Sequence, residues 1–290
     1  MSHRLSRREL FPVLPRILPV KVTCVVTRIS VDTLTLSPAD PAARVRRSIR
    51  AAYQELGRAQ KPAARSAPAY SRFVNRRLGR ALAAVSWAAG LTPNAITAVS
   101  AAFTFSAIAL LVLYPPSWQL GVAVSAGLLI GYAFDSADGQ VARVSRTASP
   151  SGEWLDHVVD ATKASALPLA LAVGLYRAEA VPEPWLLVPL AASVIGAVLF
   201  FAMILTEQLR RQHSRVPLAD TERASGGALR ALLVLPMDYG LLCLSFALLG
   251  ALSLFMVIYT AIVVATAGFL VLAAVKWYSE LKAIEIGAGS

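Results

Sequence analysis

The chain has 290 residues, of which 56% are hydrophobic and 16% charged, and its mean hydropathy is +0.59. This composition is too apolar for an ordinary soluble domain and is typical of a protein that crosses a membrane several times. Its two cysteines, Cys24 and Cys243, do not provide a disulfide framework or a cysteine-based metal site. The net charge of +11 is compatible with nucleic-acid binding, but aromatic residues are not interleaved with the basic ones, so no nucleic acid is expected as a partner.

Residues 1–69 are rich in Arg, Pro, Ser and Ala and are predicted to form a basic, loosely ordered cytoplasmic extension. Residues 70–89 then follow a helical pattern with an apolar face and a face of arginines four residues apart. The apolar face consists of Val74, Leu78, Leu82 and Val85. Such a helix is suited to lie in the headgroup plane just before a membrane span. A solvated helix that packs on protein is the alternative interpretation.

Six apolar segments follow, and they predict an all-α, polytopic membrane domain over residues 70–290. Each segment is long enough to cross a bilayer, and the second continues as helix to about residue 145. The predicted spans are residues 94–113, 118–134, 153–176, 185–205, 229–250 and 252–275.

The distribution of basic residues predicts the orientation of these spans. With the N-terminus placed in the cytoplasm, 26 of the 28 Lys and Arg residues fall in cytoplasmic segments, Arg177 falls outside and Lys163 lies within a span. This bias follows the positive-inside rule. We therefore expect a multi-pass protein of the inner or plasma membrane with both termini in the cytoplasm.

Four aspartates stand where the second and third spans meet the cytoplasm: Asp135, Asp138, Asp156 and Asp160. The first two are three residues apart on one helix and the second two are four apart on the next, so each pair shares a helical face. An aspartate at membrane depth costs about 2.5–3.5 kcal/mol, so the cluster needs a compensating charge. Hard divalent cations with all-oxygen ligands supply it, and two such ions balance four carboxylates.

Two other interpretations of this region remain open. The aspartates can form a solvated cluster at the helix ends or pair with Arg143, Arg146 and Lys163 in a salt-bridge network. The small residues Gly139 and Gly152 beside them either clear a groove for a flat ring and ribose or simply allow close helix packing, which is common in membranes.

The residues around the aspartates resemble the signature of the CDP-alcohol phosphotransferase family, D-x-x-D-G-x-x-A-R-x8-G-x3-D-x3-D. Every defined position is matched, from Asp135-Ser136-Ala137-Asp138-Gly139-Gln140-Val141-Ala142-Arg143 through Gly152 to Asp156 and Asp160. Thr92-Pro93-Asn94 also resembles the start of the first span in many members. The resemblance extends from about residue 70 to the C-terminus.

This resemblance implies a metal-dependent transferase of phospholipid biosynthesis. The four aspartates would bind two Mg²⁺ or Mn²⁺ ions, and Asp160 would also be the general base that activates the acceptor alcohol. The CDP-linked donor would be held by Asp138, Gly139, Ala142, Arg143 and Gly152. The leading hypothesis is transfer of a phosphatidyl group from CDP-diacylglycerol to a small polar alcohol with release of CMP. A homodimer is usual in the family.

Four further residues are candidates for binding the acceptor: Lys163, Asp238, Arg210 and Arg211. Lys163, inside a span, would bind a phosphate or neutralise an aspartate. Asp238, within the predicted fifth span, would line the acceptor pocket or pair with Lys163. The two arginines belong to a loop that would recognise a phosphorylated acceptor or be an ordinary basic cytoplasmic loop. His157 is expected to pack beside Asp156 and not to be a ligand.

Three other functions compete with the leading hypothesis. The stretch Gly152-Glu153-Trp154-Leu155-Asp156-His157 is similar to one in aminoalcohol phosphotransferases, which use CDP-choline or CDP-ethanolamine and diacylglycerol, although six spans are fewer than those enzymes usually carry. A transporter or catalytically silent scaffold would explain intramembrane carboxylates but not the small residues and arginine of the signature. An aspartate-rich prenyltransferase does not fit the Asp-Gly-x-x-Ala-Arg core. The sequence does not identify the alcohol.

Overall fold

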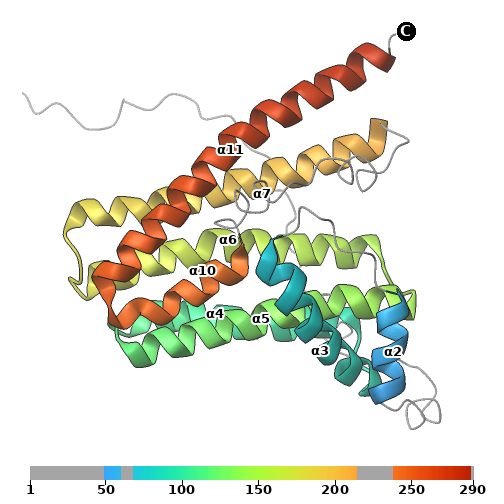
Figure 1. Ribbon diagram of the computed structural model, residues 1–290, viewed down its shortest axis with the longest axis horizontal. Coiled ribbons are helices and arrows are strands. Elements are labelled where there is room, and N and C mark those ends of the chain that lie inside the picture. The colour runs from blue at the N-terminus through green and yellow to red at the C-terminus, as the bar shows by residue number, and fades with distance from the viewer. Residues whose placement is uncertain (1–48, 60–67, 214–237, 289–290) are drawn as a thin grey trace, which may run out of the picture. The chain divides into compact units, whose positions relative to one another are not determined.

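The computed structural model describes residues 49–59, 68–213 and 238–288, and the regular structure in these residues is helical throughout (Figure 1). The all-α prediction is therefore confirmed for this part of the chain, all of which belongs to the unit Leu34–Ser290. The elements in chain order are α2 (Ile49–Ala59), η2 (Ser71–Asn75), α3 (Arg76–Ala88), α4 (Pro93–Leu113), α5 (Trp118–Ser145), α6 (Pro150–Arg177), η3 (Glu183–Leu186), α7 (Leu187–His213), α10 (Tyr239–Ser245), η6 (Phe246–Gly250) and α11 (Leu252–Ala288).

Among the described residues, five helical segments are long and apolar enough to cross a membrane: α4, α5, α6, η3 together with α7, and most of α11. They coincide with five of the six predicted spans. The remaining predicted span, 229–250, is described only from its C-terminal part, where α10 and η6 cover twelve residues, Tyr239–Gly250. This is shorter than the roughly 20 residues that a spanning helix needs. Residues 229–237 lie outside the described residues, so the sixth span stays a prediction.

The helices that carry the aspartates begin and end at local signals in the sequence. The N-caps of α4, α5 and α6 are Thr92, Ser117 and Ser149, and each side-chain oxygen accepts a hydrogen bond from the backbone N–H three residues on. After α5 ends at Ser145, Arg146 has a left-handed backbone conformation (φ 56°), a common way to end a helix. A short turn therefore reverses the chain between α5 and α6.

The helix α4 packs against both α5 and α6, which contact α4 more than they contact each other. Gly131 of α5 makes this close approach possible, because a Cβ at that position would overlap the side chain of Thr104 on α4. The hydroxyl of Ser100 on α4 donates to the carbonyl oxygen of Gly131 at 2.9 Å. The aspartates thus lie between α5 and α6, over a wall formed by α4.

A helix is present over the predicted juxtamembrane segment, as η2 followed by α3, and it packs against α5. Its small residues Gly79, Ala83 and Ala84 are buried, whereas the larger apolar side chains of Leu78 and Val85 are exposed. The helix therefore packs on protein through these small residues and Trp87, and leaves Leu78 and Val85 exposed. Its position at a membrane surface stays a prediction.

The helix α2 lies in a segment for which the sequence pattern predicted loose order, and no helix was expected there. Ala52 and Leu56 on α2 are buried in an apolar cluster with residues of α3, α4 and α5, including Trp87 and Val141. An isolated helix of 11 residues is marginal in water, so packing on these helices is what stabilises α2.

Candidate active site

Three of the four signature aspartates lie together. Asp135 on α5 and Asp156 and Asp160 on α6 each place one carboxylate oxygen so that all three atoms are within 4.8 Å of one another. The three side chains are half-buried, and we call them the aspartate cluster. Oδ1 of Asp156 is buried and has no hydrogen-bond partner in the structure. A buried carboxylate oxygen without a partner is costly, so this atom is set up to bind something that the protein does not itself provide.

Lys163 is buried one turn beyond Asp160 on α6 and bonds to two members of the cluster. Its ammonium group donates to Oδ1 of Asp135 at 2.6 Å and to Oδ1 of Asp160 at 3.0 Å. Its third hydrogen bond, at 3.3 Å, is to the hydroxyl of Ser100 on α4. Of the roles considered for Lys163 from sequence, the structure shows neutralisation of aspartates.

Asp138 is not part of the aspartate cluster within the described structure. Its carboxylate is buried one turn along α5, and Oδ2 accepts a hydrogen bond of 2.6 Å from the hydroxyl of Thr97 on α4. Because Thr97 follows Thr92-Pro93-Asn94 by one turn, the start of the first span positions this fourth aspartate.

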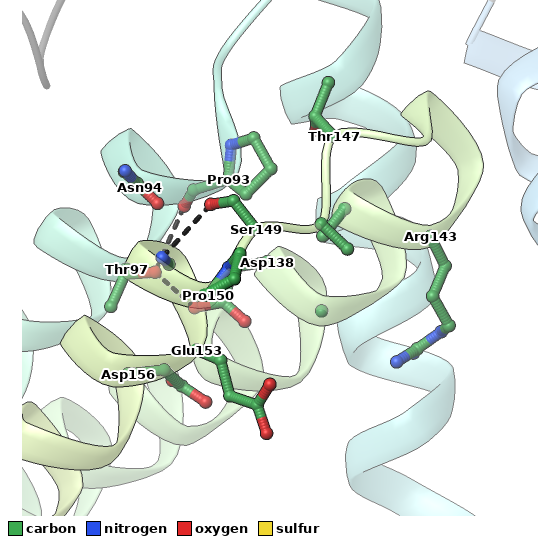
Figure 2. Close-up of a pocket in the computed structure, with 14 residues that line it drawn as sticks. Pro93, Asn94, Thr97, Asp138, Arg143, Thr147, Ser149, Pro150, Glu153 and Asp156 are labelled. Atoms are coloured by element: carbon green, nitrogen blue, oxygen red, sulfur yellow. Dashed lines mark hydrogen bonds between the residues drawn. The ribbon is translucent and has the colours of Figure 1, made fainter.

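A cavity of about 420 Å³ opens between the N-terminus of α4, the C-terminal part of α5 and the start of α6 (Figure 2). We call it the signature cavity, because it is lined by residues of the sequence signature. These include all five predicted donor-binding residues, Asp138, Gly139, Ala142, Arg143 and Gly152. In Figure 2 the labelled side chains of Arg143, from α5, and Asp156, from α6, extend from the two helices that border this cavity.

The surroundings of Gly139 separate the two explanations given for it from sequence. A Cβ at Gly139 would meet only the guanidinium group of Arg143, at 3.4 Å, which is the far end of a flexible side chain. Packing against another helix therefore does not require glycine here. Since glycine in a helix costs about 1 kcal/mol relative to alanine, the open space above Gly139 favours a ligand that approaches the backbone.

A second cavity, of about 230 Å³, lies on the other side of the aspartate cluster. We call it the aromatic cavity, because Tyr132, Phe200 and Tyr239 line it together with Asp135 and Asp160. The remaining lining residues are Thr104, Lys163 and Ala164. The cluster thus contributes Asp156 to the signature cavity and Asp135 and Asp160 to the aromatic cavity.

Comparison with known protein families agrees with this arrangement. The family model of the CDP-alcohol phosphatidyltransferases matches residues 90–272, which is more than half of the chain. The chain belongs to this family. A search of the curated proteins found no significant match. As a CDP-alcohol phosphatidyltransferase family member, the protein is a membrane transferase that moves a phosphatidyl group between a CDP-alcohol and an alcohol.

Members of this family generally depend on divalent metal ions, and the residues of the aspartate cluster fit such an ion. Three carboxylates within ligand distance of one another form an all-oxygen donor set, as Mg²⁺ and Mn²⁺ prefer. The unpartnered Oδ1 of Asp156 is an available ligand atom. No histidine or cysteine belongs to this group in the described part of the chain.

Further aromatic contacts extend from the aromatic cavity to Tyr70. Tyr132 stands edge-on to Tyr239, with ring centroids 5.0 Å apart, and stacks on Tyr70 at 6.4 Å. Burial raises the pKa of the Tyr70 hydroxyl above its usual value. His157 packs edge-on against Phe200 on α7, with ring centroids 6.2 Å apart.

Asp238 occupies a different position from the one expected within a span. It is the N-cap of α10, where Oδ1 accepts from the backbone N–H of Gly240 at 3.1 Å. Oδ2 accepts from the backbone N–H of Tyr70 at 2.6 Å, so one buried carboxylate caps α10 and anchors the segment that leads into η2. Lys163 pairs with Asp135 and Asp160 instead of with Asp238.

The two arginines considered for the acceptor lie at the C-terminal end of α7 and are paired with acids. Arg210 pairs with Glu280 on α11, and Arg211 pairs with Glu153 at 2.8 Å and with Glu207 at 3.1 Å. Neither arginine lines the signature cavity or the aromatic cavity. The rest of that basic loop, residues 214–237, lies outside the described residues.

Sequence reasoning missed most of the aromatic cavity. Tyr132 could have been found, because it precedes Asp135 by three residues and shares its helical face. Thr104, Phe200 and Tyr239 come from three other helices, and no spacing in the sequence connects them to the aspartates.

Proposed function

We propose that the protein transfers a phosphatidyl group from CDP-diacylglycerol to a small polar alcohol and releases CMP, with two divalent ions, Mg²⁺ or Mn²⁺, held by the aspartates. The observation that carries this proposal is the position of the aspartate cluster between two cavities. One cavity is lined by the residues of the signature and the other by aromatic rings. A transferase needs such an arrangement, because donor and acceptor must reach the reacting centre from different sides.

The signature cavity suits the cytidine diphosphate part of the donor. Arg143 offers a planar guanidinium group that can donate two hydrogen bonds to the oxygens of one phosphate. The open space over Gly139 and Ala142 leaves room for the ribose and the base. Asp138, fixed by Thr97, is the carboxylate that faces this cavity from α5.

The metal site proposed here consists of Asp135, Asp156 and Asp160, with Asp138 one turn away on α5. When bound, divalent ions supply polarisation of the attacked phosphorus and stabilise the negative charge on the leaving CMP. The protein's own contribution is to hold the carboxylates at a fixed spacing, and the hydrogen bonds of Lys163 and Thr97 do this.

Asp160 is proposed as the general base. It lines the aromatic cavity, so its carboxylate can reach the hydroxyl of an alcohol bound there and take its proton as the new bond to phosphorus forms. The hydrogen bond from Lys163 fixes one oxygen of Asp160, which orients the carboxylate. Such a positioned base contributes about 10²–10⁴ in rate.

The remaining expectations are proposed with this function. The distribution of basic residues supports an active site and both termini on the cytoplasmic side of the inner or plasma membrane. Residues 70–290 would then form the membrane domain, preceded by the basic extension 1–69. The protein would act as a homodimer, as is usual in the family.

The deciding experiment follows CMP release by purified protein from labelled CDP-diacylglycerol, with a panel of alcohols and with Mg²⁺ or Mn²⁺. We expect Asp160→Asn to lower turnover by about 10²–10⁴ while CDP-diacylglycerol binding is largely kept, because the amide oxygen of Asn can still bind a metal ion but can no longer take the proton of the alcohol. The matched control is Glu183→Gln, in which a carboxyl group in η3 outside both cavities becomes an amide. Normal turnover in Asp160→Asn, or loss of turnover in the control, would contradict the assignment.

A further inference from the structure

The aromatic cavity is where we look for the chemical class of the acceptor. Its walls come from α4, α5, α6, α7 and α10, and two members of the aspartate cluster face it. We infer that it binds an alcohol that carries no phosphate group, and that the hydroxyl of Tyr239 binds one of the hydroxyl or amino groups of that alcohol. This inference rests on the proposed function, because it takes the aromatic cavity as the acceptor side of the transferase.

The charges around the aromatic cavity indicate an acceptor without a phosphate group. Among the described residues that line it, the one cationic side chain is Lys163, and its ammonium group is already bonded to Asp135, Asp160 and Ser100. Two carboxylates face the same space. The two divalent ions of the proposed function would balance the aspartates, so a phosphate dianion on the acceptor would still lack a cation of its own, and burying a charge without a partner is strongly unfavourable.

The two arginines that the sequence suggested for binding a phosphorylated acceptor do not change this charge balance. Arg210 is paired with Glu280, and Arg211 bridges Glu153 and Glu207. Neither lines the aromatic cavity. In the described part of the chain, then, the guanidinium group that lines a cavity of the site is that of Arg143, on the donor side.

An uncharged polar group of the aromatic cavity, the hydroxyl of Tyr239, indicates how the acceptor is bound. The hydroxyl of Tyr239 is buried and forms no hydrogen bond of good geometry with the protein, although the thiol of Cys243, a weak partner one turn along α10, is near it. Buried hydroxyls are nearly always hydrogen-bonded, so this one lacks a partner that a ligand can supply. A hydroxyl can both donate and accept, which suits the hydroxyl or amino group of a small alcohol.

Shape and size agree with a small acceptor. The volume of about 230 Å³ is below the range of about 300–1,000 Å³ that is typical of pockets for drug-sized ligands. The rings of Tyr132 and Phe200 provide apolar faces against which the carbon skeleton of a polyol or amino alcohol can pack. The carboxylate of Asp160 on the same cavity is then next to the reacting hydroxyl.

The test uses matched pairs of acceptors that differ only by a phosphate: glycerol and glycerol 3-phosphate, inositol and inositol 1-phosphate, ethanolamine and phosphoethanolamine, serine and phosphoserine. Calorimetry measures the binding of each compound to the full-length protein in the presence of CMP and Mg²⁺, and CMP release from CDP-diacylglycerol is measured with the same compounds. We expect one unphosphorylated compound to bind and react at least about tenfold better than its phosphorylated partner.

The variant Tyr239→Phe removes only the hydroxyl and should raise the KM of that acceptor about tenfold, with the KM of CDP-diacylglycerol unchanged. The matched control is Tyr259→Phe on α11, a buried tyrosine that lines neither cavity, and it should change neither constant. Preference for a phosphorylated compound would overturn the inference while CMP release still supported the proposed function. Absence of both binding and CMP release for every compound would overturn both.

Discussion

The two cavities of the phosphatidyltransferase are built in different ways. The signature cavity is lined by fourteen residues between 93 and 156, on three helices that are consecutive in the chain and the turn between the last two, and six of them are defined positions of the sequence signature. The aromatic cavity collects residues from Thr104 to Tyr239 on five helices. The proposed donor side is therefore local in sequence, whereas the proposed acceptor side is a product of tertiary packing.

The largest expected effect concerns the cluster that both cavities share. Asp156→Asn removes the one charge of the cluster that faces the signature cavity and puts a neutral amide in place of the carboxylate whose Oδ1 lacks a protein partner. We expect its affinity for Mn²⁺, measured by electron paramagnetic resonance in the absence of substrate, to fall by at least about a hundredfold. Unchanged Mn²⁺ binding in this variant would show that the cluster is not a metal site.

Lys163→Met tests the charge balance on the acceptor side. Removing one partner of a buried ion pair costs about 3–5 kcal/mol, because Asp135 and Asp160 lose their compensating charge. The free energy of unfolding in detergent should fall by about this amount. Added Mg²⁺ should restore more stability to the variant than it adds to the wild-type protein. Equal stabilisation of both proteins by Mg²⁺ would speak against a cation at the cluster.

Gly139→Ala sharpens the contrast between a glycine kept for a ligand and one kept for packing. The protein has room for the added methyl group, so the unfolding free energy should be unchanged or rise by up to about 1 kcal/mol. In the signature cavity the methyl group would overpack the donor, at about 1–3 kcal/mol, and the Kd of CMP should rise about five- to a hundredfold.

The matched control for that substitution is Gly131→Ala on the same helix. Its methyl group would meet the side chain of Thr104 and, at 3.1 Å, the carbonyl oxygen of Ser100. This variant should lose about 1–3 kcal/mol of stability instead. If the two alanine variants behaved alike, the distinction between the two glycines would be wrong.

The smallest expected effect is at Asp238, which caps the helix of Tyr239 and binds the backbone N–H of Tyr70. Asp238→Ala removes the N-cap of α10 and should cost about 1–2 kcal/mol in thermal unfolding. Because Asp238 also holds Tyr70, which stacks on Tyr132, the KM of the acceptor should rise more than that of CDP-diacylglycerol. Ser117→Ala removes an N-cap at the other end of α5 and should lower stability alone. Equal KM changes for both substrates in Asp238→Ala would remove its positioning role.

Much of the aspartate cluster could be predicted from sequence, because helical spacing and one short turn determine which way Asp135, Asp156 and Asp160 face. The same spacing did not show that Asp138 would be held apart by Thr97, a residue 41 positions away on another helix. Nor did it show that Lys163 would bond to Asp135 as well as to Asp160, because the first of these pairs joins two helices.

The sequence alone determined the helical class, the five long apolar helices and the family, because these follow from hydropathy, caps and a signature of contiguous residues. Only the tertiary structure decided which aromatic side chains line the cavity beside the aspartates. Tyr132, Phe200 and Tyr239 meet there because α5, α7 and α10 pack around one space, and contacts between distant helices depend on crossing geometry that no local pattern encodes. The helix α2 is a further case, since an 11-residue helix is stable only through the surface on which it packs.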